Sequence, residues 1–291
     1  MEKGVLRIGI AGFGIIGKRR YHYINQLKDM KVVSVCDQVK PNSSELKENI
    51  KFYTDYRLMF MNESLDALFV CMTNDIAPKV TCEALENGLH VFCEKPPGKD
   101  VQSIEKVMEV ESRHSGLKLM FGFNHRYHRA VLKMREIIDS GELGPLMFLR
   151  ARYGHGGRVG YDREWRADPS LSGGGELIDQ GVHLIDLARW CLGDFVTIEG
   201  YAQTCYWDMP VDDNAFLMLR TAADQTAFLH ASCSEWKNTF SWEIYGKNGK
   251  LQIDGLGGSY GVERLTWYRM LPQMGPPETT AWEFPMADNS W

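Results

Sequence analysis

The sequence contains no hydrophobic run of bilayer length and no long cluster of basic residues. Its apolar stretches, such as residues 66–72, have the length of a buried strand rather than of a membrane span. A formal charge of -5, without any run of five lysines and arginines, leaves no electrostatic footprint for a nucleic-acid backbone. The chain also passes from Lys3 directly into a predicted strand, so we expect no signal peptide, no membrane and no nucleic-acid partner.

The seven cysteines show neither a CxxC pair nor the spacing of metal ligands. Most of them stand among apolar residues, which is typical of reduced thiols in a cytoplasmic protein. Asp179, His183 and Asp186 could hold a metal only with further ligands that no nearby residue supplies, so we expect no metal site. Internal repeats are also lacking. With 291 residues, 44% of them hydrophobic, the chain can bury the cores of two domains.

What the sequence does contain, in its first third, is an alternation of short apolar runs and helical patterns. Such alternation is typical of an α/β fold with a doubly wound parallel sheet. The expected strands are residues 6–11, 31–36, 67–72, 90–93 and 118–123. The expected helices are residues 16–28, a segment around 43–48, 76–87 and 103–115. The pattern therefore predicts a first domain of residues 1–123.

Beyond residue 123 the pattern changes. A helix at 129–140, a strand at 147–153 and a helix from about Glu176 to Leu192 are followed by strands without intervening helices. These strands are expected at 196–206, 214–221, 225–234, 240–245 and 250–254. Consecutive strands favour an antiparallel sheet. Residues 124–291 are therefore predicted to form an α+β domain with a large open, mostly antiparallel sheet, whose uncovered face should make the protein a homo-oligomer, a dimer or tetramer.

A glycine pattern lies between the first strand and the first helix. Gly12, Gly14 and Gly17 form GxGxxG, in which the glycines allow a tight turn, a close approach to a pyrophosphate, and close packing of helix on strand. The phosphates would meet the free N–H groups of the helix, with the intervening Phe13, Ile15 and Ile16 contributing backbone. Asp37 follows 20 residues after Gly17, where a carboxylate can accept hydrogen bonds from a ribose diol. The first domain is thus predicted to be a dinucleotide-binding Rossmann domain.

Asp37 also bears on which dinucleotide binds. Its negative charge would repel a 2′-phosphate, and no arginine follows it before Arg57. Lys40 is a flexible cation that could offset the acid. The sequence therefore favours NAD over NADP.

Two later segments occupy places where a doubly wound sheet has its ligand site, at or after the ends of strands. One is Glu94-Lys95-Pro96-Pro97, and the other is residues 173–183, which open the long helix. Asp179 and His183 are four residues apart and should share one helix face, which Asp186 and Trp190 extend. Taken alone, these residues would be read as an ordinary ion pair and a surface i,i+4 pair.

The order and spacing of five landmarks resemble the Gfo/Idh/MocA oxidoreductase family, the group of glucose-fructose oxidoreductase and inositol 2-dehydrogenase. The landmarks are the glycine pattern at 12–17, Thr73-Asn74, Glu94-Lys95-Pro96, residues 122–127 and residues 173–183. The resemblance implies an NAD-dependent dehydrogenase acting on CH–OH groups. Its hydride would pass between nicotinamide and a hydroxyl or keto carbon of a sugar, cyclitol or nucleotide-sugar.

The resemblance also implies site residues. Lys95, Asp179 and His183 would lie at the reacting carbon, between the domains. Thr73, Asn74 and Pro78 would lie near the cofactor ribose, and Glu94, with Lys95, near the nicotinamide. Chemically, His183 titrates in the range that suits a general base, whereas Lys95 can stabilise a negative oxygen or accept the proton itself. Which of the two moves the proton stays open at this stage.

The substrate candidates are Asn124, Arg126, Tyr127, His155, Arg158, Tyr161, Trp165 and Arg166. Arginines and aromatics among glycines at 154–168 suit a polar or anionic ligand, and favour a phosphorylated or nucleotide-linked sugar. A solvated or subunit-contacting arm is the competing interpretation of this loop.

Two other functions are compatible with the same fold. One is a catalytically silent regulatory protein that binds NAD(H), against which the presence of Lys95, Asp179 and His183 argues. The other is a reductase of imines or tetrapyrrole-type substrates, whose reaction would not require the Glu94-Lys95-Pro96 motif together with the Asp179 and His183 pair. Family members usually continue with a carboxy-terminal helix, so we expect the end at Trp291 to be truncated or unusual.

Overall fold

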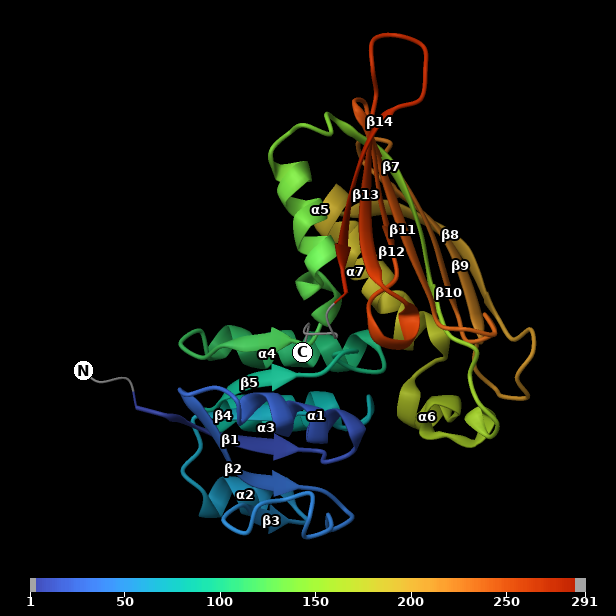
Figure 1. Ribbon diagram of the computed structural model, residues 1–291. Helices are drawn as coiled ribbons and strands as arrows, with labels where there is room; N and C mark the ends of the chain where they lie inside the picture. The colour runs from blue at the N-terminus through green and yellow to red at the C-terminus, as the bar shows by residue number, and fades with distance from the viewer. Residues whose placement is uncertain (1–3, 286–291) are drawn as a thin grey trace. The chain divides into compact units, whose positions relative to one another are not determined.

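The computed structural model describes residues 4–285 (Figure 1). The predicted ending at Trp291 lies outside these residues. The chain divides into two compact units. The N-terminal unit contains the described residues up to Gly122 together with Ser170–Gly173, and the C-terminal unit contains Phe123–Pro169 and the residues from Gly174 onward. Within the described range, no helix is both long and apolar enough to cross a membrane.

The N-terminal unit is built on a six-stranded sheet in the order β3-β2-β1-β4-β5-β6. All five strand pairings are parallel, which confirms the predicted doubly wound sheet. The strands are β1 (Leu6–Ala11), β2 (Met30–Cys36), β3 (Lys51–Tyr53), β4 (Ala67–Val70), β5 (His90–Cys93) and β6 (Leu119–Phe121). The order reverses between β1 and β4, and ligands of such sheets bind beyond the carboxyl ends of the strands at this reversal.

Helices complete the unit, and local sequence fixes where they begin. They are α1 (Ile15–Ile24), α2 (Tyr56–Asn62), α3 (Ala77–Glu86) and α4 (Val101–Arg113). The side chain of Asp55 accepts from the Arg57 N–H, and that of Asp100 accepts from the Ser103 N–H, so each caps a helix start. Pro78 stands in the first turn of α3, where its missing N–H costs nothing.

The helix predicted around residues 43–48 is wrong, because this segment forms turns. The Glu45 carboxylate accepts from the Asn42 N–H, and the Glu45 N–H donates to the Asn42 carbonyl. Such local bonds compete with helix formation. The short strand β3 and helix α2 that follow were not predicted.

The C-terminal unit is built on an eight-stranded sheet in the order β14-β13-β12-β11-β7-β10-β9-β8. Its strands are β7 (Leu146–Gly154), β8 (Phe195–Gln203), β9 (Asn214–Thr221), β10 (Thr226–Ser232), β11 (Thr239–Gly246), β12 (Gly249–Asp254), β13 (Glu263–Arg269) and β14 (Glu278–Phe284). The pairing of β7 with β10 is parallel, and the others are antiparallel. The mostly antiparallel sheet is thereby confirmed, although β13 and β14 were not predicted.

Helices α5 (Arg129–Asp139) and α7 (Val182–Leu192) lie on one face of this sheet (Figure 1). Strand β11 shows the alternation that results, with Phe240, Trp242 and Ile244 buried and the residues between them partly exposed. Leu184 and Leu187 of α7 are buried in the same core. One face of the sheet therefore builds the core, and the other carries its side chains outward.

The continuous α-helix predicted from about Glu176 is wrong at its start, because a π-helical turn at Leu177–Gly181 precedes α7. The carboxylate of Asp212 accepts from the N–H groups of Gly175 at 2.9 Å and Leu177 at 2.8 Å. A Cβ added at Gly175 would lie 1.8 Å from the Asp212 carbonyl oxygen. The helix start is therefore docked on Asp212, an interaction that residue spacing does not reveal.

Candidate functional site

The glycine turn of the N-terminal unit fits a dinucleotide. A Cβ on Gly12 would lie 2.2 Å from the Cys71 carbonyl oxygen, and one on Gly17 would lie 2.0 Å from the Gly12 carbonyl oxygen. Both glycines therefore serve the packing of the protein itself. A Cβ on Gly14 would instead meet no atom of the described residues within 4 Å. Its missing side chain leaves open the space into which a pyrophosphate would fit.

Asp37 lies beside this turn, at the end of β2. One carboxylate oxygen accepts from the Phe13 N–H at 2.6 Å, and the other accepts from the Val39 N–H at 3.1 Å. These bonds fix a half-buried carboxylate next to the glycine backbone. That is the arrangement needed to receive a ribose diol, so this observation agrees with the fit at Gly14.

Two residues predicted to lie near the cofactor ribose stand in the loop after β4 and form hydrogen bonds to other groups of the protein. Thr73 Oγ1 donates to the Asp75 carboxylate at 2.6 Å, and the buried Asn74 side-chain amide donates to the Ser172 carbonyl at 2.8 Å. Pro78 is buried in the first turn of α3. The loop lies next to the glycine turn, because Gly12 packs closely against Cys71.

The loop after β5 holds an ion pair that the sequence did not predict. Arg20 of α1 pairs with Glu94 at 2.7 Å, and the exposed fractions of the two side chains are 8% and 12%. The guanidinium carbon lies 4.4 Å from the centre of the Phe92 ring. Lys95, which follows Glu94, is partly buried. Glu94 is thus held in place by Arg20. The sequence offered one indication of this pair, namely a charged residue within a helix that packs on the sheet.

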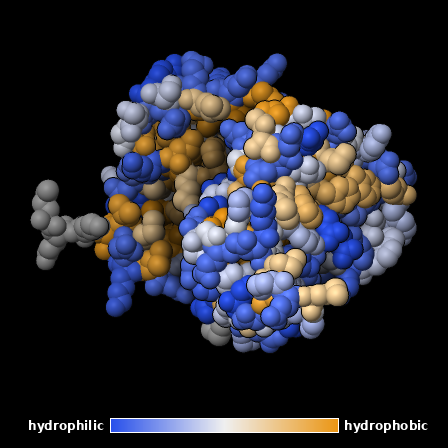
Figure 2. Space-filling view, turned by 90° about the horizontal axis from the view of Figure 1, so that it is seen from above, coloured by the Kyte–Doolittle hydropathy of each residue, from blue (hydrophilic) through white to orange (hydrophobic). Residues whose placement is uncertain are grey.

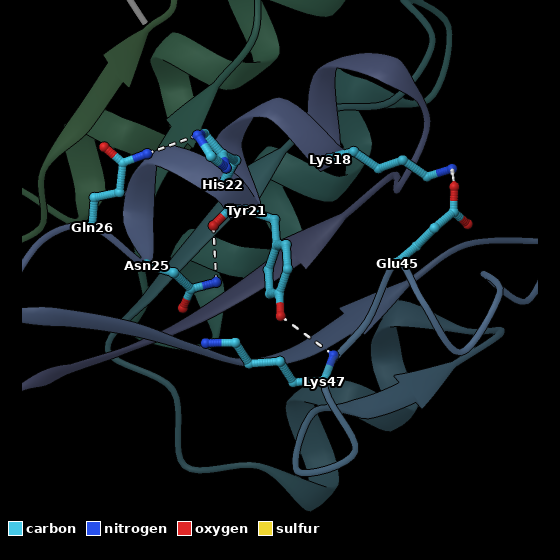
Figure 3. Close-up of a pocket in the computed structure, with 7 residues that line it drawn as sticks. All are labelled: Lys18, Tyr21, His22, Asn25, Gln26, Glu45 and Lys47. Carbon is cyan, nitrogen blue, oxygen red and sulfur yellow. Dashed lines mark hydrogen bonds and ion pairs between the residues drawn. The ribbon is translucent and has the colours of Figure 1, made fainter.

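A separate hollow of about 460 Å³ lies along the flank of α1 (Figure 3). Its lining residues are Lys18, Tyr21, His22, Asn25, Gln26, Glu45 and Lys47. The figure shows that they come from α1, from the turn that directly follows it and from the turns after β2, and that they bond largely to one another. Lys18 pairs with Glu45 at 2.6 Å, for example. None of the predicted cofactor residues lines this hollow.

In the C-terminal unit, the structure brings several predicted residues together before α7. Arg166 pairs with Asp179 at 3.0 Å, and its guanidinium lies over the Trp165 ring at 4.7 Å. Burial lowers the pKa of Arg166, but Asp179, Tyr161 and Glu164 together outweigh that effect, so the pKa is raised. This geometry provides a positive charge held against a flat ring, next to Asp179, one of the three residues expected at the reacting carbon.

Glu176, for which the sequence suggested no role, contacts two of the substrate candidates, Tyr161 and His155. The Tyr161 hydroxyl donates to its carboxylate at 2.6 Å, and His155 Nε2 lies 3.6 Å from the same oxygen. Burial, followed by Glu176, raises the pKa of Tyr161 well above its ordinary value. Burial lowers the pKa of His155. The acid had a signal in the sequence, since it directly follows three glycines in one of the landmarks.

His183 lies in an aromatic box and is 3% exposed. Its ring stacks on His125 with centroids 3.8 Å apart and planes 14° apart. Phe123 and Tyr153 meet it edge-on at 6.1 and 5.9 Å. This box holds the imidazole plane in one orientation. Neither His125 nor Tyr153 was predicted as part of the site.

The remaining substrate candidates are not gathered around Glu176. Arg126 makes two bonds to Asp186 of α7, at 2.7 and 2.5 Å. Arg158 pairs with Glu164 at 2.6 Å. Asn124 is buried, whereas Tyr127 is 47% exposed.

In residues 4–285, no group of three or more histidines, cysteines and acids has a geometry that could hold a metal ion.

Comparison with known proteins identifies the family. The family model described as "Oxidoreductase family, NAD-binding Rossmann fold" matches residues 6–123, and "GFO/IDH/MocA C-terminal domain" matches residues 131–252. The chain belongs to the GFO/IDH/MocA oxidoreductase family. As in that family, its first unit is an NAD-binding Rossmann domain, which confirms NAD as the cofactor.

One relative and two solved structures show how similar the chain is to known proteins in sequence or in fold. D-glucoside 3-dehydrogenase of Escherichia coli is 32% identical over 199 residues, which are 66% of this chain and 56% of that protein. The structure of myo-inositol 2-dehydrogenase from Lactobacillus plantarum has a TM-score of 0.77 and 27% identity, and covers 85% of this chain and 76% of its own. A levoglucosan dehydrogenase in complex with NADH has a TM-score of 0.85 and 20% identity, and covers 96% and 80%, respectively. The chain thus matches little more than half the length of this curated relative.

Proposed function

We propose that the protein is an NAD-dependent dehydrogenase that acts on a hydroxyl or keto carbon of a sugar, cyclitol or nucleotide-sugar. The observation that carries the proposal is the glycine turn with Asp37 bound to its backbone, in a chain of this oxidoreductase family. Relatives of the family are named as glucoside and inositol dehydrogenases, which supports a polyhydroxylated substrate. NAD, when bound, would supply the hydride acceptor or donor.

We further propose roles for three residues. Oxidation of an alcohol requires a base for the hydroxyl proton and a group that stabilises the developing negative oxygen. Lys95 and His183 provide the two chemistries, and the aromatic box orients the His183 ring. Asp179, paired with Arg166, would bind a neighbouring hydroxyl or tune the other two. Arg166, Trp165, His155 and Tyr161 would contact the substrate.

NAD is proposed to bind in preference to NADP. The Asp37 carboxylate is already fixed beside the glycine turn, where it would repel a 2′-phosphate. Arg57 does not counter that charge, because it pairs with Glu83 at 3.0 Å. Lys40 is exposed and is the cation nearest in sequence to Asp37 in this stretch.

A homo-oligomer is proposed from the outer face of the large sheet. Met218 pairs with Phe228 across β9 and β10, and their exposed fractions are 46% and 45%. Tyr201 on β8 is 76% exposed and pairs with Phe216. Apolar side chains are also visible between hydrophilic ones on the surface drawn in Figure 2. Light scattering should give at least twice the chain mass of 33.2 kDa, and Phe228→Arg should lower it. A monomer mass for the original protein would contradict this proposal.

A cytoplasmic location is proposed from the thiols. All seven cysteines are free, and burial raises the pKa of Cys71, Cys93 and Cys191. Unpaired, protected thiols are typical of proteins from a reducing compartment.

The test of function is a substrate panel. Glucosides, inositols, sugar phosphates and UDP-sugars are each offered with NAD+ and with NADP+, and formation of the reduced cofactor is followed by absorbance. We expect turnover with NAD+ on at least one class. Arg166→Ala should weaken turnover of that substrate, whereas Arg220→Ala, which breaks a surface pair with Asp224, serves as a control. Tight NADH binding with no turnover of any class would contradict the proposed activity.

A further inference from the structure

A short stretch of chain leaves one unit for the other and returns. Ser170–Gly173 belong to the N-terminal unit, although the residues on both sides belong to the C-terminal unit. The stretch overlaps the one-turn helix α6 (Pro169–Ser172). On the upstream side the chain carries Arg166, and on the downstream side it carries Asp179.

Three consecutive carbonyl groups anchor this stretch. The Lys99 ammonium donates to Ser170 O at 3.1 Å, the Asp75 N–H donates to Leu171 O at 3.1 Å, and the Asn74 amide donates to Ser172 O at 2.8 Å. Terminal carbonyls of a helix have no partner within it, so external donors are what such a short turn requires. Two of the three donors come from the loop after β4, which packs against the glycine turn.

The run of three glycines marks the return of the chain. Gly173 has φ +79°, and a Cβ there would lie 2.4 Å from the Lys99 carbonyl oxygen. Gly175 is equally tight against Asp212, with 1.8 Å between its added Cβ and the carbonyl oxygen. The first glycine is therefore docked in the N-terminal unit and the third in the C-terminal unit. The π-helical turn with Asp179 begins two residues later.

We propose that Asn74 is a positioning residue, which couples the cofactor loop to the segment carrying Arg166 and Asp179. The residue is 4% exposed, and its side-chain amide donates to Ser172 O in the middle of this stretch. Order imposed on the loop by NADH passes through this bond to Ser172, and from there along the chain in both directions. This inference rests on the proposed function only for the identity of the cofactor.

Hydrogen exchange measured by mass spectrometry on the whole protein tests the coupling. NADH should slow exchange of amides in peptides that span residues 163–181 of the original protein. In Asn74→Ala this slowing should disappear, while NADH affinity changes by less than about twofold and kcat/KM for the substrate falls about tenfold. Asn74→Asp, which keeps the shape but loses the donor, should behave in the same way.

Two further variants complete the test. Asn62→Ala removes an equivalent amide-to-carbonyl bond, to Leu58, at the exposed end of helix α2, and should change none of these quantities. Lys99→Met breaks the bond to Ser170 alone and should give a smaller loss in the same direction, which keeps the test open if Asn74→Ala fails to fold.

The outcomes separate the two ideas. If Asn74→Ala weakens NADH about tenfold and leaves the exchange response intact, Asn74 is a cofactor contact and the coupling is wrong. The coupling is also wrong if NADH never alters exchange at residues 163–181. Failure of the original protein to bind NADH at all would overturn the proposed function first, whatever the variants do.

Discussion

The buried pair between Arg20 and Glu94 offers the sharpest test of how the cofactor unit is held together. Both side chains are almost fully removed from solvent, at 8% and 12% exposure, and they lie 2.7 Å apart. Removing one partner of such a pair strands a charge in a poorly solvated site, which costs about 3–5 kcal/mol. Arg20→Met should cost this amount, including the contact with Phe92.

The matching variant removes both charges. Glu94→Gln combined with Arg20→Met leaves no buried charge, so the double variant should be more stable than Arg20→Met alone by about 1 kcal/mol or more. Urea unfolding followed by far-UV circular dichroism gives the free energies. Because no tryptophan stands between residues 1 and 164 and seven of the eight stand at residues 165–282, tryptophan fluorescence reports mainly on the other unit and serves as an internal control. A loss below about 1 kcal/mol for Arg20→Met, or strictly additive effects, would refute the reasoning.

Three more predictions concern single sites. Gly14→Ala should fold normally but weaken NADH binding about tenfold or more. Gly17→Ala should also lower the free energy of unfolding, because only the Cβ added at Gly17 meets protein atoms. Equal stability of the two variants by urea titration would contradict this difference. Asp37→Ser should weaken NADH by roughly 1.5–3 kcal/mol in calorimetry, through lost charge-assisted bonds, and unchanged affinity would exclude Asp37 from the site. Burial lowers the pKa of His155 and His230 below 6.5, so the folded state takes up these protons at lower pH than the unfolded state. The stability they contribute is complete above 6.5 and is lost as pH falls from there toward the folded pKa values. The urea midpoint should fall over that window, and less so in a variant with both residues changed to Gln.

The fold was largely predictable because its signals are local and periodic. Short apolar runs alternating with helical patterns predicted the parallel sheet, and closely spaced strands with turn signals predicted the antiparallel one. The parallel pairing of β7 with β10 did not follow from the same pattern, since strand order within a sheet depends on contacts far apart in sequence. The three-residue strand β3 is too short to show an alternation.

The local geometry of the candidate site was predictable where a single backbone feature fixes a residue, as at the glycines and Asp37, whose roles in binding stay predictions. It was not predictable where a distant side chain decides the geometry. Asp212 captures the N–H groups ahead of α7, from 35 and 37 residues away, and a π-helical turn appears in place of the expected helix. Glu176 and Arg20 are buried charged residues whose partners, Tyr161 and Glu94, lie elsewhere in the sequence. Composition and spacing give no sign of such pairs.

The central claim is that Lys95 and His183 act on the same substrate oxygen. The measurement is steady-state turnover of the substrate identified by the panel, for Lys95→Ala, His183→Ala and the double variant, beside NADH affinity for each. Each single change should lower turnover by about 100-fold or more and leave NADH affinity nearly unchanged. The double change should lower turnover little beyond the larger single effect, because the loss of either group already disables the one proton transfer that both serve. A double variant that folds, binds NADH and turns over at near the original rate would contradict the account, and Tyr127 and His155 would then be the next residues to test.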